Sequence, residues 1–379
     1  MQEKQIYLDY NSTTPLHPDA WNAMKAVLET PIAAYNASSV HFFGREGKKH
    51  VETARSQVAN LIGADKNQVV FNSGATEGNN TILLHFAKTY PNETILIADG
   101  QHPSITESVN TLDNIKIIPI NKDGLVKIDV LEKLLKDNKV SLISCSYANN
   151  ETGAIQNVSL LSETAHKHNA LLHIDAAQAA GRIPINIKKE NIDFLTFSSH
   201  KIGGPQGVGA LVIGICGQSP TLLFGGGQEK SLRAGTENVA GIAGFGAAAK
   251  AALENMDNYQ KLGKLRDKLE HRLKEISPDI IIHCENSNRI PNTSFFGIKG
   301  LNAQNILMSL DLEGIAISNG SACSSGSVKP SPALKAMGMS EEIASNALRI
   351  SMGWATKESD IDIFLEEFEK IIQRMSKNK

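Results

Sequence analysis

The sequence has few cysteines, no long run of charge of one sign and no apolar stretch long enough to cross a bilayer. Its four cysteines form no CxxC pair, which argues against a zinc ribbon and against a disulfide scaffold. The net charge of −2 gives no sign of a nucleic-acid or membrane-surface partner. The N-terminus is charged and lacks the apolar core of a secretory signal. These absences predict a reduced cytoplasmic enzyme without an intrinsic metal site.

With 379 residues, of which 41% are hydrophobic, the chain is long enough for two domains. Runs typical of strands lie at 69–71, 94–98, 115–119, 141–146, 170–174 and 192–197. Helical spacing is found at 18–29, 45–62, 79–88 and 239–253, and a loop is expected at 36–44. This alternation predicts an α/β unit with a mostly parallel sheet between helices. A charged helix at 255–276 leads to an α+β remainder, with strands near 280–284, 293–298 and 347–351 and a final helix at 358–375.

The stretch 192–211 carries the first candidate for catalysis. An apolar strand breaks at Ser198-Ser199-His200-Lys201 and continues into a loop rich in glycine. An ammonium group in such a pocket loses part of its hydration, so its pKa falls and the amine can add to a carbonyl. The alternative is an ordinary surface lysine in a hairpin.

Two further strand ends carry candidate ligands. At 73–76, Ser-Gly-Ala-Thr follows a strand and precedes a helix, where backbone N–H groups can hold a phosphate. It is not a Walker loop, because no GxxxxGK[ST] occurs in the chain. Asp175 ends the strand 170–174, where ligands of open α/β sheets bind and where a buried carboxylate needs a cationic partner. Each feature alone could equally be a helix cap.

Polar residues also follow two other strands, at His102 and at Asn149–Gly153. His102 in a cofactor pocket could stack on an aromatic ring and move protons, although an isolated histidine is more often a satisfied polar residue. Taken together, an anion site, a strand-end Asp175 and a loop Lys201 form the set that pyridoxal 5'-phosphate requires.

The sequence also resembles a known family, the NifS/IscS-type cysteine desulfurases, which belong to the class V aminotransferase-like, fold-type I pyridoxal phosphate enzymes. The resemblance covers essentially the whole chain, and its cysteine loop is specific to the desulfurase branch. The motifs that carry it are YLDYNSTTP (7–15), SGATE (73–77), NNETG (149–153), HIDAAQ (173–178), SSHKIGGPQGVGAL (198–211), GGGQEKSLRAGTEN (225–238) and SNGSACSSGS (318–327).

The resemblance implies roles for individual residues. Lys201 would bind the cofactor as a Schiff base and later move the substrate Cα proton, while Asp175 would pair with the pyridine nitrogen and His102 would stack on the ring. Gln178 and Asn150 would contact the ring hydroxyl or the substrate. The remaining ligands would hold the phosphate (Ala75, Thr76, Ser198, His200 and, from the other subunit of a homodimer with shared sites, Thr236).

Cys323 is the expected sulfur acceptor. Its loop is almost entirely small and polar, which predicts poor packing and mobility. A mobile thiolate could attack the substrate sulfur and carry the persulfide outward, and it could share a cluster ligand during transfer. Cys145, Cys216 and Cys284 lie in or near apolar strands and are typical of inert core residues. By the same resemblance Arg349 would bind the substrate α-carboxylate in bidentate fashion.

The implied fold is a large cofactor domain (15–257) with a seven-stranded sheet, and a smaller α+β domain (1–14 and 258–379) that carries the cysteine loop (318–331). The implied reaction converts L-cysteine to L-alanine and supplies sulfur for iron–sulfur clusters or thiolated cofactors. A selenocysteine lyase, another class V lyase or aminotransferase, and a sulfur-relay scaffold protein are the alternatives. The chain ends at Lys379, without the longer tail by which housekeeping IscS-type members dock their scaffold, so the sulfur acceptor stays open.

Overall fold

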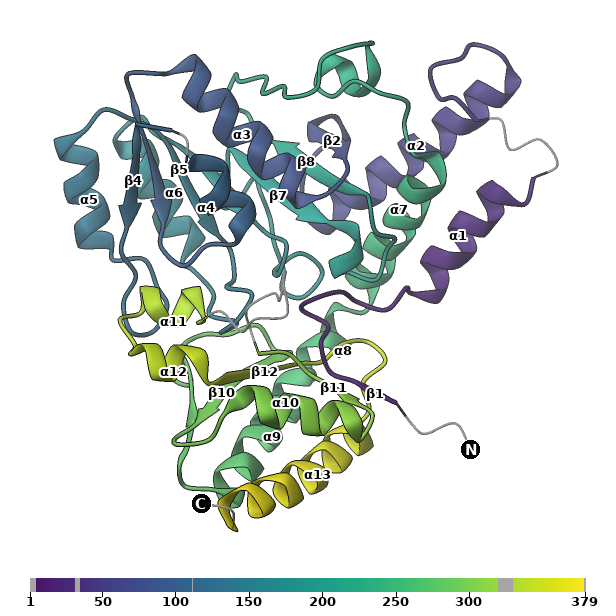
Figure 1. Cartoon of the computed structure of the whole chain (residues 1–379). Coiled ribbons are helices and arrows are strands. Elements are labelled where there is room, and N and C mark those ends of the chain that lie inside the picture. The colour runs from purple at the N-terminus through teal and green to yellow at the C-terminus, as the bar shows by residue number, and fades with distance from the viewer. Residues whose placement is uncertain (1–4, 31–34, 111, 320–329, 378–379) are drawn as a thin grey trace.

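A central seven-stranded sheet organises the larger part of the molecule (Figure 1). The structure is a computed structural model that describes residues 5–30, 35–110, 112–319 and 330–377. The strand order is β2-β8-β7-β6-β5-β3-β4. All neighbouring pairs are parallel except those that β8 makes with β2 and β7. In chain order the strands are β2 (Val69–Asn72), β3 (Thr94–Ala98), β4 (Ile115–Ile118), β5 (Val140–Ser146), β6 (Leu171–Asp175), β7 (Phe194–Ser198) and β8 (Gly209–Ile213).

Helices cover both faces of this sheet, because successive apolar side chains of each strand point to opposite sides. One face packs under α3 (Ala75–Thr89) and α4 (Pro103–Val109), with Ile95, Ile97 and Phe194 in the same cluster. The other face packs against the remaining helices of this part, α1 (Pro18–Leu28), α2 (Phe42–Leu61), α5 (Ile128–Asp137), α6 (Val158–Lys167) and α7 (Val239–Glu254). The predicted α/β fold with a mostly parallel sheet is therefore confirmed.

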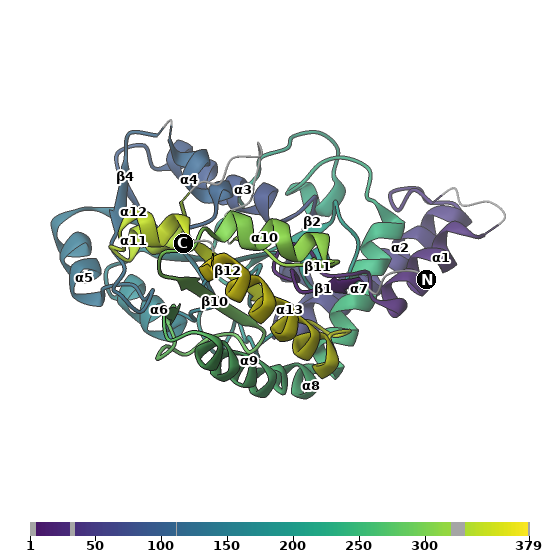
Figure 2. The same ribbon diagram turned by 60° about the horizontal axis from the view of Figure 1, so that its bottom comes forward.

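The C-terminal part forms a second hydrophobic cluster around an antiparallel sheet of order β12-β10-β9. Its strands are β9 (Ile280–Ile282), β10 (Thr293–Ile298) and β12 (Ala347–Ser351). Figure 2 shows α9 (Leu262–Ile276), α10 (Ala303–Leu312) and α13 (Glu358–Lys377) beside this sheet. The smaller elements are α8 (Met256–Gln260), α11 (Pro332–Ala336) and α12 (Glu341–Ser345). Among the described residues, no helix combines the length and hydrophobicity needed to cross a membrane.

The N-terminal strand β1 (Ile6–Tyr7) belongs to this second cluster, although α1 packs with the large sheet. It pairs in parallel with β11 (Ile315–Ala316), with Ile6 opposite Ile315. The chain then crosses to α1 through residues 8–17, and Leu8 and Ser351 share a backbone hydrogen bond of 2.8 Å. This crossing places the segment between the two sheets.

Three predicted boundaries are wrong. Helix α3 begins at Ala75 instead of 79, and α2 begins at Phe42 inside the expected loop 36–44. The single helix expected at 255–276 is two helices, α8 and α9, separated at Lys261. The α2 start depends on the His41 ring, which accepts the Gly44 N–H at 3.3 Å, and at the α3 start the Ala75 N–H donates to the hydroxyl of the distant Ser198. Local spacing in the sequence shows neither interaction.

Candidate active site

Nine of the predicted site residues line one cavity of about 210 Å³. It lies where β5, β6 and β7 end and α3 begins, which is where parallel α/β sheets bind their ligands. The nine residues come from five separate segments of the chain (Ala75, Thr76, His102, Asn150, Asp175, Gln178, Ser198, His200 and Lys201).

Lys201 ends a 3₁₀ turn (Ser199–Lys201) that follows β7 directly. Its Nζ donates to the backbone oxygens of Asn11 and Ser12, each at 2.6 Å. Burial, and after it the guanidinium groups of Arg182 and Arg349, lower the lysine pKa to about 7 against the opposing effect of the Asp9 and Asp175 carboxylates. A substantial fraction of the amine is therefore neutral near pH 7, as a nucleophile must be.

The start of α3 lies where the anion site is expected. The backbone N–H of Ala75 donates to Ser198 Oγ at 2.8 Å, which places the hydroxyl at the first turn of the helix. Gly74 has φ of +153°, a conformation that residues with a side chain rarely adopt. A Cβ at this position would also approach Ser198 Oγ to 3.3 Å. The glycine therefore lets the turn bring the Ser198 hydroxyl and the first turn of α3 together in one wall of the cavity.

Asp175 is a buried carboxylate held by neutral donors. Its Oδ1 accepts the Ala177 N–H at 2.9 Å, and its Oδ2 accepts an N–H of the Asn79 amide at 2.8 Å. Asn79 is itself fully buried and accepts a hydrogen bond from the Thr196 hydroxyl. Neither hydrogen-bond donor to Asp175 carries a charge, so the carboxylate can receive a cationic ligand such as a protonated ring nitrogen.

His102 lies across the cavity from the lysine loop, at the N-terminus of α4. Its Nδ1 accepts the Ser104 N–H at 3.1 Å and lies 2.8 Å from Ser104 Oγ, so Nε2 is the nitrogen available for proton transfer. The ring is open to solvent on one side. Loss of hydration on the other side lowers its pKa, with Asp175 opposing and Lys201 adding to the effect. A neutral imidazole suits both stacking on a ring and accepting a proton.

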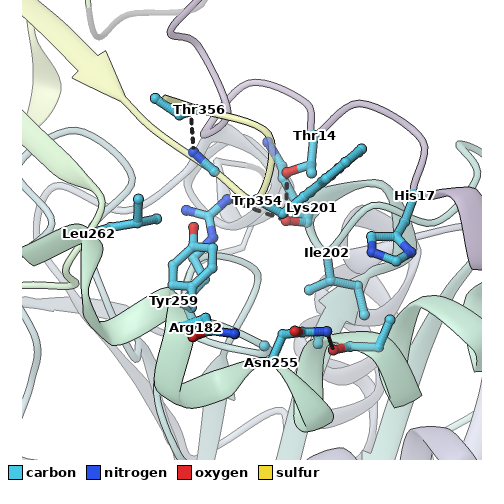
Figure 3. A pocket seen from close by; sticks show the side chains of 15 residues that line it. Thr14, His17, Arg182, Lys201, Ile202, Asn255, Tyr259, Leu262, Trp354 and Thr356 are labelled. Carbon is cyan, nitrogen blue, oxygen red and sulfur yellow. Dashed lines mark hydrogen bonds between the residues drawn. The ribbon is translucent and has the colours of Figure 1, made fainter. Parts of the chain in front are cut away.

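A second, larger cavity of about 370 Å³ lies on the other side of the Lys201 backbone (Figure 3). Thr14 Oγ1 donates to the Lys201 carbonyl at 2.9 Å in its wall. Trp354 closes another wall by packing edge-on against His17, with ring centroids 5.0 Å apart. Lys201 is the only predicted cofactor ligand in this wall among the described residues. We therefore assign the chemistry to the smaller cavity.

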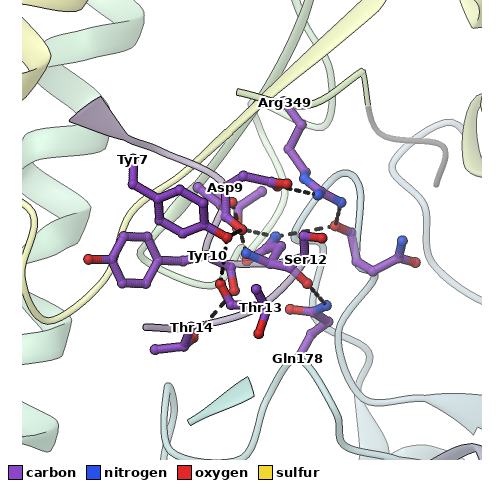
Figure 4. Close-up of polar contacts among 12 residues, drawn as sticks. Tyr7, Asp9, Tyr10, Ser12, Thr13, Thr14, Gln178 and Arg349 are labelled. Atoms are coloured by element: carbon purple, nitrogen blue, oxygen red, sulfur yellow. Dashed lines mark hydrogen bonds and ion pairs between the residues drawn. The ribbon is translucent and has the colours of Figure 1, made fainter. Parts of the chain in front are cut away.

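Arg349 extends from β12 toward the cavity and contacts the N-terminal segment (Figure 4). Its guanidinium donates to Asp9 Oδ1 at 2.7 Å and to the backbone oxygen of Asn150 at 2.9 Å. Its Nε is buried without a hydrogen-bond partner among the described residues. An unpartnered N–H on a guanidinium beside the cavity is suited to a carboxylate ligand.

Among the described residues, two predicted site residues do not line this cavity, namely Arg349, which lies beside it, and Thr236. Thr236 lines a different cavity of about 160 Å³, together with Ser73 and Arg233. Cys323 and most of its loop lie outside the described residues. The other three cysteines are described: Cys145 and Cys284 are buried and Cys216 is half-buried. Burial raises the pKa of the Cys145 thiol to about 12, which suits the inert role expected for it.

Sequence reasoning missed four residues that hold the site together: Asp9, Asn11, Asn79 and Arg182. The first two lie in the segment 7–15, whose motif by itself assigns no role to its individual residues. Asn79 lies one helical turn after Ala75, so a helix starting at 75 would have placed it beside the anion site. No local pattern indicates that Arg182 is buried.

Comparisons with known proteins agree with this geometry. The aminotransferase class-V family model matches residues 6–364. Cysteine desulfurase IscS of Dictyoglomus turgidum is 37% identical, over 98% of this chain and 96% of that protein. The solved NifS-like protein of Rickettsia africae is 38% identical and has a TM-score of 0.90, covering 98% of this chain and 100% of that chain. A solved complex of SspA with cysteine is 27% identical, with a TM-score of 0.79 over 92% and 99% of the two chains.

The chain therefore belongs to the aminotransferase class-V family. Within that family it groups with the cysteine desulfurases of the NifS and IscS type. The cofactor of this family is pyridoxal 5'-phosphate. The described residues fit that molecule, since Ser198 and the first turn of α3 line one wall of the cavity, Asp175 has no charged hydrogen-bond donor among them, and the Lys201 amine is partly neutral.

Proposed function

We propose that this chain is a pyridoxal phosphate-dependent cysteine desulfurase that converts L-cysteine to L-alanine and passes the sulfur to Cys323. The single observation that carries the proposal is the convergence of a partly neutral Lys201, the Asp175 carboxylate and the α3 anion site on one cavity. Relatives named cysteine desulfurase match the chain over 98% of its length, which supports the substrate.

Each residue in the cavity has a distinct task in this proposal. Ala75, Thr76, Ser198 and His200 would hold the phosphate, and Asp175 would pair with the ring nitrogen. When bound, pyridoxal phosphate withdraws electrons from the Cα of the amino acid attached to it. Lys201 would hold the cofactor through its amine in the resting enzyme, and its neutral amine would remove and return the proton at the substrate Cα.

The remaining side chains select and orient the substrate. Arg349 binds the α-carboxylate through its planar guanidinium, and Asn150 and Gln178 contact the cofactor ring or the substrate. His102 stacks on the ring and accepts or donates a proton through Nε2. These roles agree with the positions of the four residues in or beside the cavity.

Sulfur transfer is a displacement at the substrate sulfur. The Cys323 thiolate forms a new S–S bond, the substrate Cβ–S bond breaks, and its electron pair stays with carbon, which takes up a proton. One cysteine and one enzyme thiol thus give one alanine and one enzyme persulfide. Such a step needs a thiolate.

A homodimer, a cytoplasmic location and an outside sulfur acceptor for iron–sulfur or thiolated products complete the proposal. In the dimer, Thr236 would contribute to the phosphate site of the partner subunit. The domain limits 15–257 and 1–14 with 258–379 are also proposed. The second hydrophobic cluster lies within the smaller of these domains, whereas the first also includes residues beyond 257, such as Cys284, Leu334 and Ala347.

The proposal is tested by cysteine turnover with the wild-type enzyme, Cys323→Ser and, as a matched control, Cys216→Ser. We expect equimolar alanine and persulfide or sulfide from the wild type and the control, and neither product from Cys323→Ser. Equal alanine release from all three would indicate a lyase in which sulfur leaves without this thiol. A cofactor-loaded wild type that fails to turn over cysteine but accepts selenocysteine or another amino acid would contradict the proposed substrate. A protein that binds no cofactor would favour a sulfur-relay scaffold.

A further inference from the structure

Arg182 is a fully buried arginine that connects three parts of the active site. It follows β6, seven residues after Asp175 in the sequence, and its exposed fraction is 1%. Nη1 donates to Asn11 Oδ1 and Gln178 Oε1. Nη2 donates to the backbone oxygen of Tyr10 at 3.2 Å and to that of Lys201 at 3.4 Å. Figure 3 shows the side chain between Tyr259 and the lysine loop.

Arg182 differs from the other buried arginines of the described chain because no carboxylate pairs with it. Arg55, Arg289 and Arg349 each form an ion pair with a carboxylate, at 2.7 Å in all three cases. Every acceptor of Arg182 is neutral, and its Nε has no partner among the described residues. A guanidinium stays protonated in proteins, so the site contains a buried positive charge that no neighbouring acid neutralises.

The contacts of Arg182 fix the orientation of the Gln178 amide. A guanidinium has only donors, so the amide atom that faces it must be the oxygen. The amide nitrogen then faces the backbone oxygen of Asn11, to which it donates one N–H at 3.0 Å. The second N–H is left for the cavity that Gln178 lines. Gln178 therefore presents a donor, and not an acceptor, to a bound ligand.

We propose that Arg182 is a positioning residue for the cofactor site. It orients the Gln178 amide as a hydrogen-bond donor and links the backbone of Lys201 to the N-terminal segment. It also places a positive charge without an acidic partner near the Lys201 amine. The inference rests on the proposed function for the identity of the cofactor. A donor at Gln178 suits an oxyanion on the cofactor ring.

The charge of Arg182 acts on the lysine amine in a known direction. After burial, Arg182 is the largest influence that lowers the Lys201 pKa to about 7. The other charged or titratable groups that interact with Lys201 come from separate segments (Arg349 lowers its pKa, Asp9 and Asp175 raise it, and His102 and His200 each interact with it). Removing the Arg182 charge leaves the two carboxylates less opposed, so the pKa of Lys201 should rise.

The test measures Lys201 without relying on turnover. Full-length protein stripped of cofactor is labelled with acetic anhydride at a series of pH values, and the extent of acetylation at Lys201 is read by mass spectrometry. Affinity for pyridoxal phosphate is measured separately by titration of the same protein. Arg182→Met removes both charge and hydrogen bonds, Arg182→Lys keeps only the charge, and Arg289→Met is a control for loss of a buried arginine elsewhere.

We expect Arg182→Met to move the labelling midpoint of Lys201 to higher pH, to slow labelling near pH 7 several-fold, and to weaken cofactor binding. Arg182→Lys should restore the midpoint but not the affinity, because a single ammonium cannot make the four contacts of the guanidinium. Arg289→Met should lower thermal stability and leave the midpoint unchanged. A shared shift in both methionine variants would reduce Arg182 to a structural role.

A further variant, Gln178→Glu, covers the case in which Arg182→Met fails to fold. It keeps the arginine and gives it a carboxylate partner, so the labelling midpoint should again rise. Unchanged midpoints in Gln178→Glu and in any folded Arg182 variant would overturn the proposal. Because none of these measurements depends on cysteine turnover, an enzyme with a different substrate would still give a clear result.

Discussion

Arg349 and Asp9 form an ion pair of 2.7 Å although they lie 340 residues apart in the sequence. The arginine comes from β12 and the aspartate from the N-terminal crossing segment, and both residues contact the region of Asn150 or Lys201. The pair orients a guanidinium whose Nε has no hydrogen-bond partner in the part of the chain that the structure describes. A substrate carboxylate would therefore meet a donor group that is already held in place.

Arg349→Lys should weaken recognition of the substrate. A lysine keeps the charge but lacks the planar set of donors, so at least one charge-assisted hydrogen bond is lost. Such bonds are worth about 1.5–3 kcal/mol, which corresponds to a fall of about 10- to 100-fold in kcat/KM, mostly through KM. Steady-state kinetics with L-cysteine measures the effect. Arg272→Lys, a half-exposed residue on α9, is the control, and an unchanged KM in Arg349→Lys would remove Arg349 from the substrate site.

Asn79→Asp should impair the cofactor site by changing the residue that holds Asp175. The new carboxylate would lie 2.8 Å from Asp175 in a buried position, where two like charges raise each other's pKa. Protonation of the pair would weaken the interaction of Asp175 with a ring nitrogen, and loss of such a preorganised charge costs about 10²–10³ in kcat. The adjacent Asn80→Asp provides a matched control, since that side chain contacts only backbone oxygens. Comparable kcat values for the two variants would contradict the role of Asn79.

Glu229→Gln should destabilise the fold without touching the cavity. Both oxygens of Glu229 accept hydrogen bonds from Arg55, at 2.7 and 2.8 Å, and one also accepts the Phe71 N–H at 2.9 Å. Removing one partner of a buried pair costs about 3–5 kcal/mol of unfolding free energy, and the second ion pair of Arg55, with Glu52 at 2.9 Å, places the expected loss at the lower end of this range. Urea denaturation measures this loss. The exposed pair of Glu132 and Lys136 gives the control Glu132→Gln, for which a change below about 1 kcal/mol is expected.

Acidification should destabilise the protein through buried histidines. Burial lowers the pKa of His283 from 6.5 to about 4, and its Nε2 has no partner among the described residues. The unfolded chain therefore binds this proton at a higher pH than the folded one, so stability is lost as the pH falls from about 6.5 to about 4. One such histidine contributes about 3 kcal/mol over that range.

The comparison of His283→Gln with the exposed His271→Gln isolates this effect. Only the first variant should flatten the dependence of unfolding free energy on pH. Glu151 acts in the opposite direction. Burial raises its pKa to about 6, so the folded protein binds this proton at a higher pH than the unfolded chain. Its contribution should therefore reduce the slope of unfolding free energy against pH between about pH 4.5 and 6. Identical slopes in the wild type and His283→Gln would show that folding does not lower the pKa of His283.

The order of elements and the main catalytic side chains could be predicted from the sequence for a physical reason. Strand ends followed by small or polar residues mark the ligand-binding edge of a parallel sheet, so Lys201, Asp175 and the turn before Ala75 could be placed together before any coordinates. Asn79 and Arg182 could not, because their importance depends on which distant groups surround them. Helix starts were missed for the same reason, as the Ser198 hydroxyl beside the start of α3 comes from another strand.

The crossing of the N-terminal segment has a consequence for protein synthesis. The Asn11 N–H donates to Ser351 Oγ at 2.9 Å, and Asn11 and Ser12 supply both acceptors of the Lys201 amine. A chain emerging from the ribosome can therefore form much of the large sheet, but it must wait for β12 before this segment is anchored. Contacts of such long sequence separation form late because closing the loop costs conformational entropy. We expect a nascent chain released before β12 to keep its lysine but lack its substrate clamp.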